Sequence, residues 1–195
     1  MEAFLETERL LLRRFSEADG ENLYLLDSDP DVMRYLSGGR ATPREAIENE
    51  VLPRFLEYHA RFESLGFFAA VDKASGRFLG WFHLRPPKDA SPGLELGYRL
   101  RKEAWGRGYA TEVSLALIRK AFVELGAERV VAYALAVNRP SRRVMEKAGL
   151  KLRRTFHQPE LAHIEGAQNG SVEYELTRRD WEARQAIDAA TESDA

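Results

Sequence analysis

The chain has 195 residues, 44% hydrophobic and 31% charged, with a formal net charge of -2 at neutral pH. This composition is typical of one globular domain, and the near-zero charge argues against a dedicated nucleic-acid binder. The absence of cysteine excludes a thiol nucleophile, disulfides and cysteine-based metal sites, and it fits a cytoplasmic location. No apolar run approaches the roughly 18 residues of a membrane span, and the opening MEAFLETERL lacks a signal-peptide core. The four histidines show no paired ligand spacing, so we expect no metal. The net charge and the lack of a long apolar run likewise predict no nucleic acid and no membrane contact.

The first elements are a strand and two short helices. RLLLRRF, residues 9–15, has the imperfect alternation of a strand. Ser16 is a candidate N-cap for the helical pattern that follows. That pattern breaks near Pro30, and Asp29 serves as the cap where it resumes.

The next segment predicts a longer helix and a β-hairpin. Thr42 is the expected N-cap, with Pro43 at the first helical position, and Pro53 is expected to kink or divide the helix. GFFAAVDKASGRFLGWFHLRP reads as two strands joined through DKASGR, and PPKDASPG reads as a loop.

The second half alternates strands and helices. LELGYRL, residues 94–100, is a strand, and the helix after the glycine turn WGRGYATEV ends at Gly126. RVVAYALAV is apolar on both faces, which indicates a central strand. SRRVMEKAGL is a short helix ended by Gly149, and KLRRTF and SVEYELTR complete the sheet. We expect one α/β domain over residues 1–184, and a frayed tail over 185–195.

The glycine turn lies between a strand and a helix. Free backbone N–H groups at the positive end of a helix dipole suit phosphate. A dinucleotide fingerprint would need a third glycine where Thr111 stands and an acidic residue where the next strand ends on Asn138. A Walker A loop is absent as well. The bland alternative is a turn that only packs the helix against the sheet.

The sequence resembles the GCN5-related N-acetyltransferases (the GNAT family), and within it the branch of ribosomal-protein N-terminal acetyltransferases (RimJ/RimL-like). The resemblance is carried by TERLLLRRF, DPDVMRYL, LELGYRL, AWGRGYATE, NRPSRRVMEKAGLKL and YELTRRDW, in the order of the family, over about residues 7–181. It implies a mostly antiparallel mixed sheet of about seven strands with a central, splayed parallel pair, flanked by about four or five helices. It also implies acetyl-CoA as co-substrate and an amine as acceptor.

The resemblance implies that backbone amides of the glycine turn hold the pyrophosphate of acetyl-CoA. Tryptophan replaces the Gln or Arg usual at the start of this motif, which spares backbone chemistry. The residues concerned are Trp105, Gly106, Arg107, Gly108, Tyr109, Ala110 and Thr111.

The strand 94–100 supplies the next set of implied site residues. The pantetheine arm would lie between this strand and RVVAYALAV, beside Leu96, Gly97 and Tyr98. Gly97 indicates a bulge or a close backbone approach. The amide near Leu96 or Gly97 would face the thioester carbonyl and stabilise its oxyanion. Glu95 is the candidate base that takes the proton of the amine; the alternative is a solvated cross-strand charge, since Glu95 shares a face with Arg99.

The helix that begins near Ser141 supplies the remaining candidates. Asn138 would bond the pantetheine amides, and Ser141 would protonate the leaving thiolate; the alternative role of Ser141 is the N-cap of that helix. Many relatives use a tyrosine four residues later, where this chain has Met145. Arginines around the cofactor, Arg143 among them, would contact its phosphates or form a solvated basic face; the others are Arg107, Arg139 and Arg142.

Three further groups are weaker candidates for the acceptor side. Trp81, Phe82 and His83 precede the proline loop, where the two aromatic residues are expected in the core and His83 on the surface. His157 and His163 lie in the last long loop. Acidic residues in the expected acceptor helix would suit a cationic acceptor, although surface helices carry such charges anyway; these are Glu45, Glu48 and Glu50.

The sequence therefore predicts a cytoplasmic N-acetyltransferase in which an amine attacks acetyl-CoA directly, since no cysteine can carry the acetyl group. The acceptor is a protein N-terminus or, alternatively, a small amine such as an antibiotic, a polyamine or an amino acid. A non-catalytic acyl-CoA-binding module is the other alternative. A homodimer is compatible with the sequence, and no residue decides it.

Overall fold

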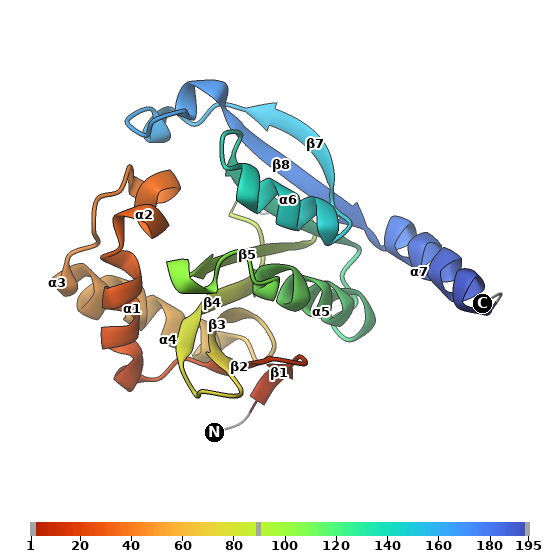
Figure 1. Ribbon diagram of the computed structural model, residues 1–195, viewed down its shortest axis with the longest axis horizontal. Helices are drawn as coiled ribbons and strands as arrows, with labels where there is room; N and C mark the ends of the chain where they lie inside the picture. Colours follow the sequence, from red (N-terminus) through yellow and green to blue (C-terminus); the bar gives the residue numbers. More distant parts are fainter. Residues whose placement is uncertain (1–2, 89–90, 194–195) are drawn as a thin grey trace.

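The protein is built around one eight-stranded sheet with the order β1-β2-β3-β4-β5-β6-β8-β7 (Figure 1). The computed structural model describes residues 3–88 and 91–193. The strands are β1 (Ala3–Glu6), β2 (Leu10–Arg14), β3 (Gly66–Asp72), β4 (Phe78–Arg85), β5 (Leu94–Leu100), β6 (Arg129–Leu135), β7 (Lys151–Phe156) and β8 (Ser171–Thr177).

The sheet confirms the predicted fold class. Every neighbouring pair of strands is antiparallel except β5 and β6, which run parallel at the centre. The strand that was not predicted is β1. Its four residues are exposed or half-buried, so it lacks the alternation of polar and apolar residues by which a strand is recognised.

The parallel pair stays together over a very short distance. Only Leu94 with Val130 and Glu95 with Val131 are paired, although both strands continue for several residues. Beyond Glu95 the facing edges of β5 and β6 therefore separate, and their backbone groups need other partners. This gap is the splay that the sequence analysis expected.

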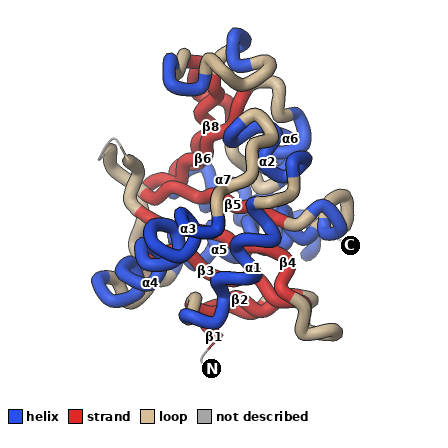
Figure 2. Tube along the Cα trace, turned by 90° about the vertical axis from the view of Figure 1, so that its left-hand side faces the viewer, coloured by secondary structure: helices blue, strands red, loops and turns tan. Residues whose placement is uncertain are grey.

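Helices cover both faces of the sheet. The helices α1 to α4 gather on the left of Figure 1 and lie toward the viewer in Figure 2, whereas α5 and α6 cover the other face. Their bounds are α1 (Gly20–Asp27), α2 (Pro30–Ser37), α3 (Arg44–Ala46), α4 (Leu52–Arg61), α5 (Tyr109–Val123), α6 (Arg139–Lys147) and α7 (Arg178–Ser193). None of these described helices is long and apolar enough to cross a membrane.

Two apolar cores result, one on each face. The larger core joins α5 and α6 to the sheet through fully buried residues such as Val113, Leu117 and Leu84. The smaller core joins α1, α2 and α4 to β3 and β4 through an aromatic group that includes Phe55, which stacks on Phe67 with ring centroids 4.0 Å apart. The smaller core forms the floor of the cavity described below.

Buried carboxylates fasten the helices of the smaller core to the sheet. Asp19 is 2% exposed and accepts two hydrogen bonds of 2.7 Å from the guanidinium of Arg13 on β2.

Asp29 caps α2 by accepting from the amide of Asp31 at 2.9 Å, which confirms the predicted cap.

The expected capping of the next helix by Thr42 is wrong. The hydroxyl of Thr42 donates to the carboxylate of Asp27 at 3.2 Å, and the helix begins at Arg44 with Pro43 as its N-cap. A π-helical turn over residues 47–51 precedes Pro53. Because proline has no N–H and its ring presses on the carbonyl four residues earlier, this wide turn accommodates it within a continuous helical run.

The C-terminal segment also differs from the expectation. Helix α7 continues to Ser193 where a frayed tail was expected from residue 185, since alanine and glutamate favour a helix. Trp181 packs against Phe122 with ring centroids 5.4 Å apart, and beyond this contact α7 projects from the body (Figure 1). Residues 194 and 195 lie outside the described residues.

Candidate active site

The glycine turn has a backbone that favours glycine. Gly106 and Gly108 have φ angles of 70° and 82°, a left-handed conformation that costs other residues free energy. The indole N–H of Trp105 donates to the carbonyl oxygen of Leu100 at 2.9 Å. This bond ties the turn to the end of β5, so the glycines lie at the open end of the gap.

The turn leaves several amides at the start of α5 without a partner from the helix. Gly108 is the N-cap and has no side chain to accept from them. The first helical hydrogen bond runs from the amide of Glu112 to the carbonyl of Gly108 at 3.0 Å. The N–H groups of Tyr109, Ala110 and Thr111 precede it, and together with the helix dipole they form an anion site.

Arg9 supports this anion site, and the sequence analysis missed it. Its guanidinium lies 2.6 Å from the carboxylate of Glu112 and donates to the carbonyl of Arg107 at 2.9 Å. It also lies over the ring of Tyr109, 4.4 Å from the centroid. Arg9 therefore holds the turn in place and neutralises the one carboxylate in the first turn of α5. Its contacts, about a hundred residues away in sequence, carry no local signal.

Tyr98 and Ser141 meet across the gap. The phenol of Tyr98 on β5 donates to the hydroxyl oxygen of Ser141 on α6 at 3.3 Å. Burial raises the pKa of Tyr98 to about 12, although the hydrogen bond to Ser141 acts in the opposite direction. The phenol therefore keeps its proton at neutral pH. Met145 is buried in the larger core.

Helix α6 begins earlier than expected. Asn138 is its N-cap and accepts from the amide of Ser141 at 3.2 Å, so the alternative role of Ser141 as the N-cap is wrong. Arg142 donates to the phenol of Tyr174 and to a backbone carbonyl, which makes it part of the scaffold. Arg143 is exposed on the same helix.

A cavity of about 760 Å³ lies on the opposite face of the sheet from α5 and α6. Its floor is the aromatic surface of β3, β4 and β5, and its walls come from α1, α2, α4, β6 and β7. The lining residues are Asp27, Met33, Leu36, Thr42, Val51, Arg54, Phe55, Tyr58, Phe67, Trp81, His83, Arg85, Lys88, Glu95, Arg99, Tyr133, Arg154, Phe156 and Gln158.

Glu95 lies in this cavity beside the point where β5 and β6 separate. The guanidinium of Arg85, its cross-strand neighbour, lies 2.7 Å from both carboxylate oxygens. Burial alone would raise the pKa of Glu95, but contact with His83 and the charges of Arg85 and Lys88 hold it below its ordinary value. Glu95 is thus a cross-strand charge, but its side chain is only 12% exposed rather than solvated, and Arg99 on the same face bonds to Asp27. Glu95 is therefore an ionised, fixed carboxylate.

His83 corrects two expectations at once. It is 8% exposed rather than a surface residue, and it lies directly opposite Gly97 in an unbroken register, so β5 has no bulge there. A methyl group on Gly97 would lie 2.5 Å from the imidazole Cε1, so the close approach predicted at Gly97 is that of the His83 ring.

The imidazole Nε2 of His83 lies 3.2 Å from Glu95, but it is not aligned for a hydrogen bond. Burial lowers the pKa of His83.

The remaining candidates divide between the two faces. Trp81 lines the cavity, whereas Phe82 is fully buried. His157 and His163 do not line the cavity, although Gln158 of the same loop does.

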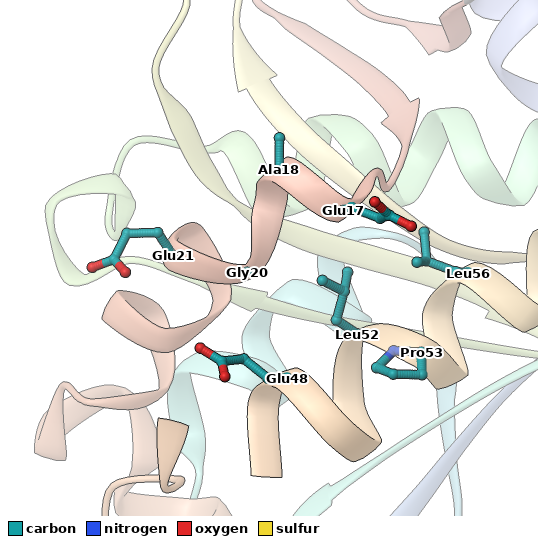
Figure 3. Close-up of a pocket in the computed structure, with 8 residues that line it drawn as sticks. All are labelled: Glu17, Ala18, Gly20, Glu21, Glu48, Leu52, Pro53 and Leu56. Atoms are coloured by element: carbon teal, nitrogen blue, oxygen red, sulfur yellow. The ribbon is translucent and has the colours of Figure 1, made fainter. Parts of the chain in front are cut away.

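The acidic residues of the long helix do not reach the cavity either. Glu48 lines a separate hollow of about 590 Å³ between the start of α1 and α4, beside Glu17 and Glu21 (Figure 3). Glu45 and Glu50 line neither hollow. The predicted acidic acceptor surface is therefore not part of this site.

Comparison with known proteins assigns the family. The model of the acetyltransferase (GNAT) domain matches residues 9–151, and the chain belongs to this family of acetyltransferases. It is 34% identical over 185 residues to the FsC-acetyl coenzyme A-N(2)-transacetylase of Aspergillus fumigatus, covering 91% of this chain and 77% of the relative.

Solved structures share the fold at lower identity. The ribosomal-protein-S5-alanine acetyltransferase of Vibrio fischeri has a TM-score of 0.71 and 18% identity, covering 91% of this chain and 97% of that one. The spermidine N-acetyltransferase of Vibrio cholerae, in complex with CoA and spermine, has a TM-score of 0.71 and 15% identity, covering 88% and 97%. Because these neighbours come from different branches, the resemblance to the RimJ/RimL branch stays a prediction.

The contact between Gly97 and His83 generates a prediction about packing. Gly97→Ala is expected to lower the free energy of unfolding by about 1–3 kcal/mol, because its methyl group overlaps the imidazole of His83. In the background of His83→Ala the same substitution should cost much less. Urea denaturation of the four proteins of this double-mutant cycle measures the coupling. Equal costs in both backgrounds would contradict the contact.

Proposed function

We propose that this acetyltransferase transfers the acetyl group of acetyl-CoA to the primary amine of a compact acceptor by direct attack in a ternary complex. One observation carries the proposal: the gap between β5 and β6 separates two complementary sites. The unpaired amides of α5 lie at its open end, and the cavity with Glu95 lies on the other face of the sheet. A thioester held in the gap would meet an amine that enters from the cavity.

The residues present fit acetyl-CoA. The amides of Tyr109, Ala110 and Thr111 would hold the pyrophosphate. Among the described residues, no heavy atom beyond the adjacent residues lies within 4 Å of the position that a methyl group on Gly106 would take, so the turn has room for a ligand. Exposed Arg143 and Arg107 would meet the phosphates. The pantetheine would lie beside Leu96, Gly97, Tyr98 and Asn138.

Glu95 is the proton acceptor in this mechanism. The nitrogen lone pair attacks the thioester carbonyl carbon, the carbonyl electron pair moves to oxygen, and the nitrogen becomes more acidic as the new bond forms. A weakly basic carboxylate then suffices to take the proton, directly or through water. The backbone amide near Gly97 would donate to the oxyanion.

Tyr98 and Ser141 are the proposed proton donors to the leaving thiolate. When the oxyanion collapses, the carbon–sulfur bond breaks and the sulfur keeps the electron pair. The phenol of Tyr98 comes from β5 and meets the hydroxyl of Ser141. It would thus supply the phenol that relatives carry at the position of Met145.

The cavity supports a compact acceptor. Its volume of about 760 Å³ lies within the usual range for small-molecule sites. The relative from Aspergillus fumigatus is named for FsC and its N(2) position, and we propose a small-molecule amine rather than a protein N-terminus for this chain.

Binding of acetyl-CoA tests the glycine turn. Gly106→Trp is expected to weaken binding about a hundredfold in calorimetric titration, because the side chain fills the space in which charge-assisted hydrogen bonds to phosphate would form. Gly76→Trp is the matched control. Gly76 has a φ angle of 69° against 70° for Gly106, and no atom lies near its methyl position either. Equal binding by both variants would refute the cofactor site.

Turnover tests Glu95. Glu95→Gln is expected to lower kcat about a hundredfold or more, with little change in acetyl-CoA binding. Because the pKa of Glu95 lies below its ordinary value of 4.5, wild-type activity is expected to fall through protonation of Glu95 only below that pH. The rise in activity toward alkaline pH is expected to follow deprotonation of the acceptor amine.

The control for Glu95→Gln is Asp19→Asn. Asp19 is also a buried carboxylate held by an arginine, but it lies outside the cavity. Unchanged kcat in Glu95→Gln would remove Glu95 from the mechanism and leave the cofactor site standing.

The phenol across the gap makes a separate prediction. Tyr98→Phe is expected to lower kcat about tenfold, a modest effect because a thiol near pKa 8.5 leaves readily. If Tyr98 and Ser141 act as one unit, Tyr98→Phe with Ser141→Ala should lose no more than the worse single variant. Tyr174→Phe is the control, since its phenol bonds to Glu146 on α6. Multiplicative losses in the double variant would show separate roles.

A further inference from the structure

The acceptor cavity has a strong excess of basic residues, which sets it apart from the rest of the molecule. Five basic side chains and two carboxylates line it, whereas the whole chain has a formal net charge of -2. The excess is therefore a property of this cavity and not of a generally basic surface. The basic residues are Arg54, Arg85, Lys88, Arg99 and Arg154.

Both carboxylates of the cavity are already occupied by arginines. Arg85 binds Glu95 at 2.7 Å, and Arg99 binds Asp27. Neither carboxylate is left to bind a second cation on an acceptor.

Of the other three basic side chains, Arg154 pairs with Glu173, which lies outside the cavity lining. The remaining two are Arg54 and Lys88. Arg54 lies over the ring of Phe55 and Lys88 follows β4; among residues 3–88 and 91–193, no carboxylate forms an ion pair with either of them. Both are exposed and so lie at the rim, whereas the side chain of Glu95 is 12% exposed and lies deeper.

Between Arg54 and Glu95 the cavity is aromatic, whereas Lys88 follows the end of β4 at which Arg85 pairs with Glu95. Phe67 and Trp81 of the sheet pack edge to face with ring centroids 5.7 Å apart, and Tyr58 and Phe156 join the lining from α4 and β7. This surface suits an apolar body. A ligand that spans the cavity would thus meet a carboxylate at depth, aromatic rings in the middle and Arg54 at the rim.

We infer that the acceptor is a primary amine that carries an anionic group, with an apolar body between the two, and that Arg54 binds the anion. The inference rests on the proposed function, because the amine end is placed by Glu95. Acceptors with additional positive charges are disfavoured, since they would meet uncompensated basic side chains at the rim.

Three acceptors of one shape test this selection. Para-(aminomethyl)benzoate, para-(aminomethyl)benzamide and para-(aminomethyl)benzylamine differ in the charge opposite the reacting amine, which is negative, neutral or positive. Their binding to the full chain in the presence of CoA, and the release of CoA thiol from acetyl-CoA, are measured separately. The benzoate is expected to bind about tenfold more tightly than the benzylamine, with the benzamide between them, and added salt should reduce the difference.

Variants assign the selection to the rim. Arg54→Gln is expected to raise KM for the benzoate about three- to tenfold with kcat unchanged, and to leave the benzamide unaffected. Arg61→Gln is the matched control, since Arg61 is an exposed arginine on the same helix that does not line the cavity.

The outcomes separate the two proposals. Equal binding of the three compounds, tighter binding of the benzylamine or no binding of any overturns the anionic selection. Equal losses for benzoate and benzamide in Arg54→Gln overturn the role of Arg54. If the benzoate binds preferentially but no thiol is released, the selection stands and the proposed transfer to such an amine fails.

Discussion

The brief pairing of β5 with β6 is the constraint on which the rest of the site depends. Two parallel strands that pair at Leu94 and Glu95 and then separate leave backbone donors and acceptors facing a gap at the centre of the sheet. Such groups are costly when they are buried without partners. The protein surrounds the gap with side chains and helix ends that suit a polar, elongated ligand, so in the proposed function the interruption that weakens the sheet also defines where the cofactor would lie.

The two sides of the gap are coupled through single residues of β5. Successive residues of a strand face opposite sides of the sheet, so Glu95 faces the cavity whereas Tyr98 reaches Ser141 on the face covered by α5 and α6. Gly97 between them has no side chain, and the ring of His83 fills that space. The imidazole in turn contacts Glu95. A glycine in this strand therefore determines the surroundings of a carboxylate two residues away.

The candidate site residues that the sequence singles out lie within single segments. The glycine turn, Glu95 and Ser141 could be singled out because their residues are close in the chain and follow the order of a known family. Arg9, His83 and the charge of the cavity could not, because their roles depend on the register between strands and on how α2 and α4 cover the sheet. Similarly, β1 was missed because its four residues are exposed or half-buried and show no clear alternation. Helix α7 was not predicted because an exposed alanine-rich helix has little apolar periodicity.

The charge of the cavity bears on the chemistry as well as on selection. A free amine is the nucleophile, and a protonated amine cannot attack. Positive charge near an amine lowers its pKa, because it disfavours the ammonium form. If Arg54 binds the anionic end of the acceptor, its charge is largely neutralised there, while Arg85 and Arg99 near the amine offset Glu95 and Asp27. The amine end would then enter surroundings close to electrical neutrality, where a fixed and weakly basic carboxylate assists removal of its proton without forming a persistent ion pair with the ammonium form.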